Sequence, residues 1–331
     1  MEYVPFGRTG VMVSRLAMGT MTFGWEPEDW GSTKEDAIKI GQKALDLGIN
    51  FFDTANVYAR GVSEEITGEI IRPVRREIFL ATKVHGRMGE GPNDWGNSRR
   101  HIIEQCEASL KRLKTDWIDL YQLHRPQPTI PIDETLRALD DLIRQGKVRY
   151  IGTSTFAAWQ VCEAHYIARE LGTNRFVSEQ PPYNLLDRRI EKELLPFCRT
   201  YLYAVIPWSP LAGGQLTGKY LTKVQEGRYA KSDPNRRITA RSTEVVRKLK
   251  RIADSMGVSL TSLSLAWVLN QPGITSAIIG ARKIEQFDDL VKATELKLPA
   301  RVLERIDRIV PPSSYIVDYY SADFGPGVLP I

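Results

Sequence analysis

Short apolar runs alternate with longer segments of helical periodicity along most of the chain. The runs are nearly continuous, which is typical of strands buried on both faces of a parallel sheet. We expect eight strands, at residues 15–18, 50–52, 78–82, 118–123, 148–152, 176–179, 203–207 and 276–279. A short hairpin is expected before them, in which residues 3–6 and 11–13 flank a turn at Arg8-Thr9-Gly10.

Helical periodicity fills the intervals between these strands. Ser98 could cap one helix and Gly146 could end the next, while Leu136, Leu139 and Leu142 form a stripe that faces a core. The expected helices span residues 34–47, 64–71, 99–113, 133–145, 157–171, 189–198 and a long region, 242–270.

Repeated strand–helix units with right-handed crossovers predict a (β/α)8 TIM barrel of the α/β class. We expect a single domain over residues 1–331, with the hairpin at its start and long loops at the C-terminal face of the barrel. An open doubly wound sheet is the alternative, and it is disfavoured because no Gly-x-Gly-x-x-Gly follows an early strand. The long irregular segments 85–97, 211–240 and 310–331 are expected to be functional loops, the last folding over that face.

Composition narrows the class of protein. The net charge of +5 over 331 residues is small and its lysines and arginines are scattered, which argues against nucleic-acid binding. Three widely spaced cysteines suggest neither a disulfide framework nor a metal site. No signal core and no apolar stretch near the ~18 residues needed to cross a bilayer is visible. We therefore expect a soluble cytoplasmic protein without a metal or membrane partner.

Polar residues with complementary proton chemistry follow three successive predicted strands. Asp53 ends one of them, with Tyr58 in the next loop, Lys83 ends the next and His124 follows the third. Taken alone, Asp53 is better explained as a helix cap or turn residue, Lys83 as an ordinary strand-end lysine, Tyr58 as a loop aromatic and His124 as a structural histidine. If the strands are neighbours in a barrel, however, all four side chains meet at one rim.

Together these four groups could transfer a proton to a carbonyl oxygen. A phenol has an unperturbed pKa near ~10, and an ammonium group beside it favours the phenolate. Lys83 could supply this charge to Tyr58, Asp53 could hold Lys83, and His124 could orient the carbonyl. The residues include no strong nucleophile, so the electrons of a redox reaction would have to come from a cofactor.

The motif Asp53-Thr54-Ala55-Asn56-Val57-Tyr58 resembles the Asp-Thr-Ala-x-x-Tyr motif of the aldo-keto reductase superfamily. Thr82-Lys83 and Leu123-His124 fall where that family has its lysine and histidine, and the resemblance runs to about residue 310. It implies a barrel that binds NADP(H) and reduces a small aldehyde or ketone. By this resemblance Tyr58 is the general acid, Lys83 and Asp53 tune it, and His124 orients the substrate.

The resemblance also implies residues that bind the nicotinamide half of NADPH. Trp208 matches the aromatic residue that stacks on the ring, and Thr155 stands where relatives often have Asn. Lys219 could reach a phosphate as a point charge. The full set on this side comprises Gly19, Thr20, Met21, Asp53, Ser154, Thr155, Gln180, Trp208, Ser209, Pro210, Leu211, Ala212, Gly213 and Lys219.

The adenosine half is expected after the eighth strand. Backbone N–H groups at Gly280 to Lys283 open a helix and could bind an anion. Arg282 could fork onto a ribose 2′-phosphate, which favours NADP over NAD. Gln286 and Asp289 match adenosine-side positions, whereas Leu290 stands where many relatives have Asn.

Two other functions stay open. The chain also resembles the potassium-channel β-subunit branch of the superfamily, which implies an NADP-binding regulatory subunit; that branch has Asn at the position of His124. A barrel with a different chemistry, such as an isomerase, is the other possibility. The substrate and oligomeric state are undetermined, and a homo-oligomer is compatible with the sequence. The aromatic and imidazole side chains that could line the substrate pocket are Trp25, Trp30, His85, Trp95, Tyr315, Tyr319, Tyr320 and Phe324.

Overall fold

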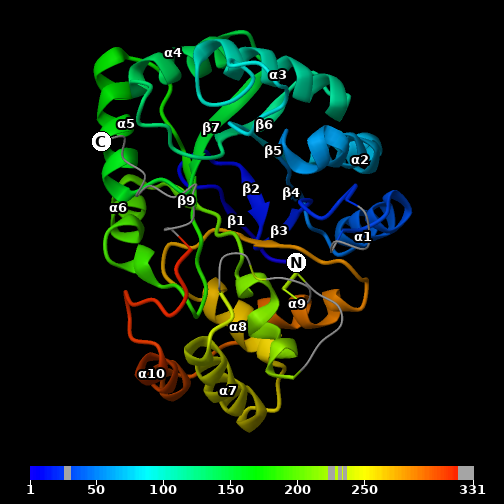
Figure 1. Ribbon diagram of the computed structural model, residues 1–331, viewed down its shortest axis with the longest axis vertical. Helices are drawn as coiled ribbons and strands as arrows, with labels where there is room; N and C mark the ends of the chain where they lie inside the picture. The colour runs from blue at the N-terminus through cyan, green and yellow to red at the C-terminus, as the bar shows by residue number, and fades with distance from the viewer. Residues whose placement is uncertain (26–30, 223–227, 230–232, 234–236, 320–331) are drawn as a thin grey trace.

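The computed structural model of the chain describes residues 1–25, 31–222, 228–229, 233 and 237–319. An 8-stranded parallel sheet has the order β10-β3-β4-β5-β6-β7-β8-β9. The two edge strands, β10 and β9, are joined by hydrogen bonds in and beside them, from Thr275 N to Val205 O (2.9 Å) and from Ile278 N to Pro207 O (3.0 Å), which close the sheet into a barrel. The expected (β/α)8 barrel is therefore confirmed (Figure 1). The strands are β1 (Tyr3–Pro5), β2 (Met12–Ser14), β3 (Leu16–Gly19), β4 (Phe51–Asp53), β5 (Phe79–Val84), β6 (Ile118–Leu123), β7 (Val148–Ser154), β8 (Ser178–Gln180), β9 (Ala204–Val205) and β10 (Ala277–Ile279).

Helices cover the outside of the sheet, with α7, α8 and α10 grouped below the barrel in the view of Figure 1. The five helices expected at 34–47, 64–71, 99–113, 133–145 and 157–171 begin and end within two residues of the expected positions. The helix expected at 189–198 is instead the short turn η4 (Arg189–Glu191) followed by α6, and no ranges were predicted for α9 and α10. The helices are α1 (Lys34–Asp46), α2 (Val62–Ile71), α3 (Arg99–Leu113), α4 (Ile132–Arg144), α5 (Ala158–Leu171), α6 (Leu194–Tyr201), α7 (Ala240–Ser255), α8 (Leu260–Leu269), α9 (Gln286–Glu295) and α10 (Ala300–Ile309).

The long helical region expected at 242–270 is two helices. The chain leaves α7 at Gly257, whose φ is 68°, and Ser259 caps α8 by accepting a hydrogen bond from Ser262 N (3.0 Å). Glycine adopts this left-handed conformation without the cost of a side chain, so it permits the break. No single described helix is long and apolar enough to cross a bilayer; α7 and α8 together would meet that test, but they are bent by 94°.

The opening hairpin closes the N-terminal end of the barrel. Strands β1 and β2 pair antiparallel as expected. Phe6, which follows β1, is fully buried, and its ring lies 5.8 Å from that of Phe51 and 4.7 Å from that of Phe79. Because Phe51 and Phe79 are the first residues of β4 and β5, the hairpin plugs the barrel with aromatic rings and leaves the opposite end free for a site.

The C-terminal segment folds back over the barrel, as expected, as far as it is described. Ile316 N and Val317 N donate hydrogen bonds to Leu186 O, at 2.8 and 3.0 Å. Arg188 donates from Nη1 to Val310 O at 2.6 Å, and Tyr319 N reaches Asp187 at 3.2 Å. These contacts bring Tyr319 beside the loop that follows β9. The expected pocket aromatics Trp30, Tyr320 and Phe324 lie outside the described residues.

Candidate active site

The strand register brings the predicted polar residues together at the C-terminal end of the barrel. Asp53 pairs with Gly19 on one side and Ala81 on the other. Lys83 pairs with Gln122 in the next strand, and Ser154 pairs with Gln180. Side chains at the ends of neighbouring parallel strands face one rim, so chain positions far apart in sequence share one site.

The centre of the site is a buried ion pair between Lys83 and Asp53. Lys83 Nζ donates to Asp53 Oδ2 at 2.5 Å, to the Thr54 carbonyl oxygen at 2.8 Å and to Tyr58 Oη at 3.3 Å. The lysine side chain is fully buried. Burial by itself lowers the pKa of Lys83, but the Asp53 carboxylate and Tyr58 outweigh it and raise the pKa. Lys83 is therefore a permanent cation at neutral pH.

Two amide side chains hold the other oxygen of Asp53. Gln122 Nε2 donates to Asp53 Oδ1 at 3.1 Å and Gln180 Nε2 donates to the same oxygen at 2.8 Å. Gln180 Nε2 also donates to the side-chain oxygen Oε1 of Gln122, at 3.2 Å. Both oxygens of the carboxylate are thus engaged. Gln180, which was expected to bind the cofactor, lines the cavity, and its amide nitrogen contacts Asp53. Gln122 was not predicted, because nothing in the sequence distinguished it from other strand residues.

Tyr58 lies at the start of a tight turn, η2 (Tyr58–Gly61). Ala59, Arg60 and Gly61 all have positive φ angles, of 45°, 52° and 99°. Such a conformation costs of order 1–2 kcal/mol for each residue with a side chain, and strain of this kind is often found at functional sites. The turn directs the Tyr58 hydroxyl towards Lys83 rather than into the preceding loop.

His124 faces Tyr58 across the site. The two rings meet edge to face, with centroids 5.6 Å apart. Burial lowers the pKa of His124 well below 6.5, and the charges of Arg125, Lys83 and His85 lower it further. The imidazole is therefore neutral at pH 7 and can donate one N–H to an oxygen placed between it and Tyr58.

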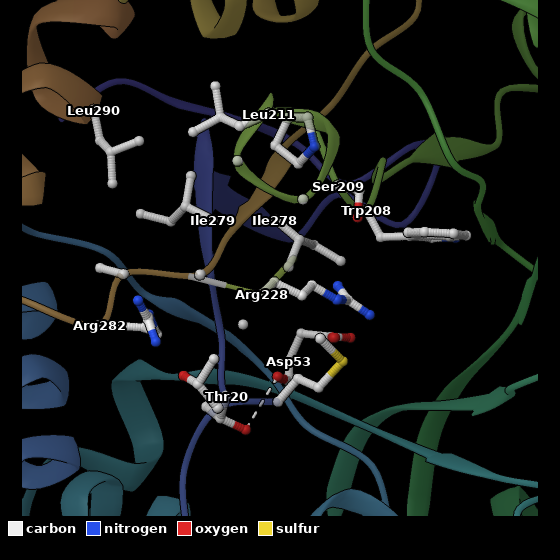
Figure 2. Close-up of a pocket in the computed structure, with 18 of the residues that line it drawn as sticks. Thr20, Asp53, Trp208, Ser209, Leu211, Arg228, Ile278, Ile279, Arg282 and Leu290 are labelled. Atoms are coloured by element: carbon white, nitrogen blue, oxygen red, sulfur yellow. Dashed lines mark hydrogen bonds between the residues drawn. The ribbon is translucent and has the colours of Figure 1, made fainter. Parts of the chain in front are cut away.

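A cavity of about 650 Å³ extends from these residues along the C-terminal end of the barrel. Figure 2 shows Trp208 and Asp53 at one end, Arg282 at the other and Arg228 between them. Tyr58, His124 and all of the predicted cofactor-binding residues except Thr155 and Ala212 line it. Lys83 is buried behind the wall. The sequence analysis noted Ala281 and Leu290, which also line the cavity, but it missed Thr22, Arg125, Gly214, Thr217, Arg228, Arg237, Thr261, Ile278 and Ile279.

Thr155 and Ala212 lie behind the wall of the cavity. Thr155 Oγ1 accepts hydrogen bonds from Arg125 Nη1 at 3.0 Å and from Trp208 Nε1 at 3.3 Å. Its contribution is therefore to anchor the residues that do line the cavity. Ala212 is fully buried in the hydrophobic core. Its φ of 51° belongs to a series of left-handed residues in this loop, and its N–H group is occupied, since Ala212 N donates to Ser209 O at 2.9 Å.

Two cationic groups gather at the end of the cavity away from Tyr58. Burial lowers the pKa of Lys219, and the charge of Arg282 adds to the effect, so the two cations lie close to each other. Gly214, with φ 96°, lets the lysine fold against the loop, since a Cβ there would lie 2.8 Å from Lys219 Cε. A phosphate group between Lys219 and Arg282 would relieve their repulsion.

Gln286 lines the cavity, and its side chain also binds the backbone just before α9. Its Oε1 accepts hydrogen bonds from Arg282 N at 2.7 Å and from Lys283 N at 3.3 Å. Of the backbone N–H groups from Gly280 to Lys283 that were expected to bind an anion, those of Arg282 and Lys283 are thus occupied by this side chain. Arg282 is left to bind an anion through its guanidinium group. The predicted adenosine-side residue Asp289 lines the cavity, and Ser262 Oγ donates to its carbonyl oxygen at 2.9 Å.

None of the described aromatic or imidazole candidates for the substrate pocket lines the cavity. Trp25, Trp95 and Tyr315 are solvent-exposed, and His85 binds Asn97 at 3.0 Å. Tyr319 is fully buried and packs edge to face behind Trp208, with centroids 5.6 Å apart. The expected aromatic wall is therefore limited here to Trp208 and Tyr58.

Residues 15–311 match the sequence model of the Aldo/keto reductase family. The chain belongs to this family. It is 40% identical over 329 residues to the uncharacterized oxidoreductase YrpG of Bacillus subtilis (strain 168), covering 94% of this chain and 96% of that protein. Members of the family typically depend on a nicotinamide cofactor and act on small carbonyl compounds, which agrees with a cavity that has an aromatic end and a cationic end.

Two further relatives are named for different functions. The chain is 39% identical over 320 residues to a probable voltage-gated potassium channel subunit beta of Oryza sativa subsp. japonica, covering 93% and 95% of the two chains. It is 32% identical over 332 residues to the versiconal hemiacetal acetate reductase of Aspergillus parasiticus, covering 93% and 96%. Both relatives span nearly the whole chain, so similarity alone does not separate a reductase from a channel subunit.

The ion pair can be tested by its effect on stability. Replacing Lys83 by Met leaves a buried carboxylate without its cation, so we expect Lys83→Met to lower the free energy of unfolding by about 3–5 kcal/mol. The double variant Asp53→Asn/Lys83→Met should be more stable than Lys83→Met, since the charge left behind is gone. Urea denaturation measures both. The exposed pair Lys34–Glu69 supplies the control Lys34→Met, which should change little; additive losses in the double variant would contradict the coupling.

The buried neutral histidine predicts a pH effect. Because the pKa of His124 is far lower in the folded protein than its ordinary value of 6.5, the unfolded chain binds a proton below pH 6.5 that the folded protein does not. Stability should therefore fall as pH falls. Between pH 7 and 5.5 this loss should be about 1 kcal/mol larger in the wild type than in His124→Gln, measured as free energy of unfolding. Parallel pH profiles would show that His124 titrates normally.

Proposed function

We propose that this protein is an NADPH-dependent reductase that converts a small aldehyde or ketone to an alcohol. The observation that carries the proposal is the convergence of Tyr58, Lys83, Asp53 and His124 at one end of a long cavity whose other end is cationic. When bound, NADPH supplies the hydride that reduces the carbonyl carbon.

The cavity suits NADPH in size and in the order of its lining. About 650 Å³ lies within the range of ligand pockets. Trp208 offers an aromatic face beside Tyr58, and the loop after it offers backbone N–H groups and Lys219 for phosphates. Arg282, next to Lys219, is placed to bind a 2′-phosphate as a planar fork, which supports NADPH over NADH.

Proton transfer falls to Tyr58. Its hydroxyl is close to the Lys83 ammonium, at 3.3 Å, and this charge stabilises the phenolate left after the proton has gone to the carbonyl oxygen. His124, neutral and facing Tyr58, donates a hydrogen bond to the same oxygen and holds it in place. Asp53, fixed by Gln122 and Gln180, keeps Lys83 protonated and positioned.

A regulatory subunit is the second candidate, favoured by the similarity to proteins named as potassium channel β-subunits. Such a role would need cofactor binding but not turnover. Steady-state reduction of an aromatic aldehyde with NADPH separates the two. Tight NADPH binding without turnover would favour the subunit.

Removing the Tyr58 hydroxyl tests the general acid. Tyr58→Phe keeps the ring that packs on His124, so NADPH should bind as in the wild type by calorimetry. Turnover of an aromatic aldehyde should drop by ~10²–10⁴-fold, as typical for losing a general acid. Tyr166→Phe removes an exposed hydroxyl on α5 and should leave kcat unchanged. Substantial turnover by Tyr58→Phe would assign the proton to another group.

Cofactor choice is tested at Arg282. Arg282→Ala should raise the KM for NADPH by roughly tenfold or more, since one charge-assisted contact to the 2′-phosphate is lost, and should leave the KM for NADH nearly unchanged. Arg301→Ala, at an exposed arginine of α10, is the control and should alter neither. Equal increases for both cofactors would remove Arg282 from 2′-phosphate recognition.

A further inference from the structure

Gln122 is a buried polar residue that touches neither the cofactor nor the substrate space of the proposed reaction. It lies two residues after Leu120 on β6, so the two side chains share one face of the strand. Leu120 belongs to the same core cluster as Phe51 and Phe79. Gln122 is fully buried and is not part of the cavity lining. Whatever this side chain does, it does through the groups that its amide contacts.

The Asp53 carboxylate decides which way the two amides beside it point. A carboxylate only accepts hydrogen bonds, and its Oδ2 already accepts from Lys83 at 2.5 Å. Gln122 and Gln180 both donate from Nε2 to Asp53 Oδ1, at 3.1 and 2.8 Å. An amide turned the other way would place its own oxygen against the carboxylate oxygen, and two acceptors repel each other. The orientation of both amides is therefore set by charge.

Gln122 occupies the second N–H group of Gln180. An amide nitrogen has two N–H donors, and Gln180 gives one to Asp53 and the other to Gln122 Oε1, at 3.2 Å. Within the described residues no group donates to Gln180 Oε1, and this oxygen is not one of the enclosed polar atoms that lack a partner. Because Gln180 lines the cavity, its oxygen is the side-chain atom that is open to a ligand there.

We propose that Gln122 is a positioning residue, which fixes the Gln180 amide so that the cavity receives its oxygen and neither of its N–H groups. A ligand at this point must then donate a hydrogen bond, as the carboxamide NH2 of a nicotinamide ring can. Without Gln122, one N–H of Gln180 loses its acceptor and is free to turn to the cavity as a donor. This proposal rests on the proposed function, because it concerns how the same site selects its cofactor.

The test uses an NADP analogue in which an acetyl group replaces the carboxamide. In 3-acetylpyridine adenine dinucleotide phosphate a methyl group stands in place of the NH2, while the carbonyl oxygen and the phosphates remain. Calorimetry measures the dissociation constants of NADP+ and of this analogue without any turnover. We expect the wild type to bind NADP+ roughly tenfold more tightly, since the analogue leaves the Gln180 oxygen without a donor.

Two substitutions of Gln122 separate its hydrogen bonds from its packing. Gln122→Met keeps an unbranched side chain but removes the amide, so the preference for NADP+ should fall by roughly fivefold. Gln122→Glu should keep the wild-type preference, because its carboxyl oxygen still accepts from Gln180. The matched control is Gln42→Leu on α1, where an exposed glutamine also donates to an aspartate, Asp46, at 3.1 Å. This control should keep the wild-type preference as well.

A measurement on the wild type covers the case in which Gln122→Met does not fold. The two side-chain N–H protons of Gln180 are followed by nitrogen-edited NMR. Both should exchange slowly with solvent, because both are hydrogen-bonded to buried acceptors. Rapid exchange of either proton would reveal an N–H group open to the cavity and would overturn the proposal.

Three binding results would also overturn it. Equal affinities of the wild type for the two nucleotides would show that the Gln180 oxygen does not distinguish NH2 from methyl. An equal loss of affinity for both nucleotides in Gln122→Met would leave Gln122 a purely structural role. A preference lost in Gln122→Glu would show that the accepting oxygen is not what matters. These results leave the reductase function intact, whereas a wild type that binds no NADP+ or NADPH would refute the proposed function and this proposal with it.

Discussion

The burial of one positive charge constrains the whole catalytic end of this barrel. The ammonium group of Lys83 has no access to water, so its hydration must be replaced by fixed acceptors. Asp53, the Thr54 carbonyl oxygen and the Tyr58 hydroxyl supply them. The Asp53 carboxylate has in turn the amide donors of Gln122 and Gln180. Residues from β4, β5, β6 and β8 must therefore lie in register for the pair to be stable, and the same register places the Tyr58 hydroxyl beside a cation.

Cationic side chains line both ends of the cavity, and the two ends differ in the groups that accompany them. Lys219 and Arg282 lie at one end, and Arg125 lies beside His124 and Trp208 at the other. Figure 2 draws Arg228 between Arg282 and Trp208. The neutral imidazole of His124 stands among the cations because burial lowers its pKa. A hydrogen-bond donor that carries no charge can orient a carbonyl oxygen without competing with Lys83 for Asp53.

The order of strands and the polar residues at their ends could be predicted from the sequence, because a strand buried on both faces leaves a continuous apolar run and any polar residue at its end stands out. Ser98 as a helix cap was also predictable, since the capping side chain bonds within three residues, to His101 N. The family resemblance assigned Gln286, Thr155 and Ala212 to cofactor binding. Gln286 lines the cavity, and its side-chain oxygen also accepts a hydrogen bond from Arg282 N. Thr155 and Ala212 lie behind the cavity wall.

The sequence by itself determined the barrel, its hairpin and the four polar groups at the rim, because periodicity and strand ends are local features and parallel register aligns them. Only the tertiary structure decided that Gln122 and Gln180 share one carboxylate oxygen and that Tyr319 packs behind Trp208. It also decided that Arg125 lies near the Trp208 ring and that Arg237 stacks on Tyr319. These relations join residues up to 127 positions apart. They depend on how the loops close, and loop closure leaves no pattern in the chain from which such contacts can be read.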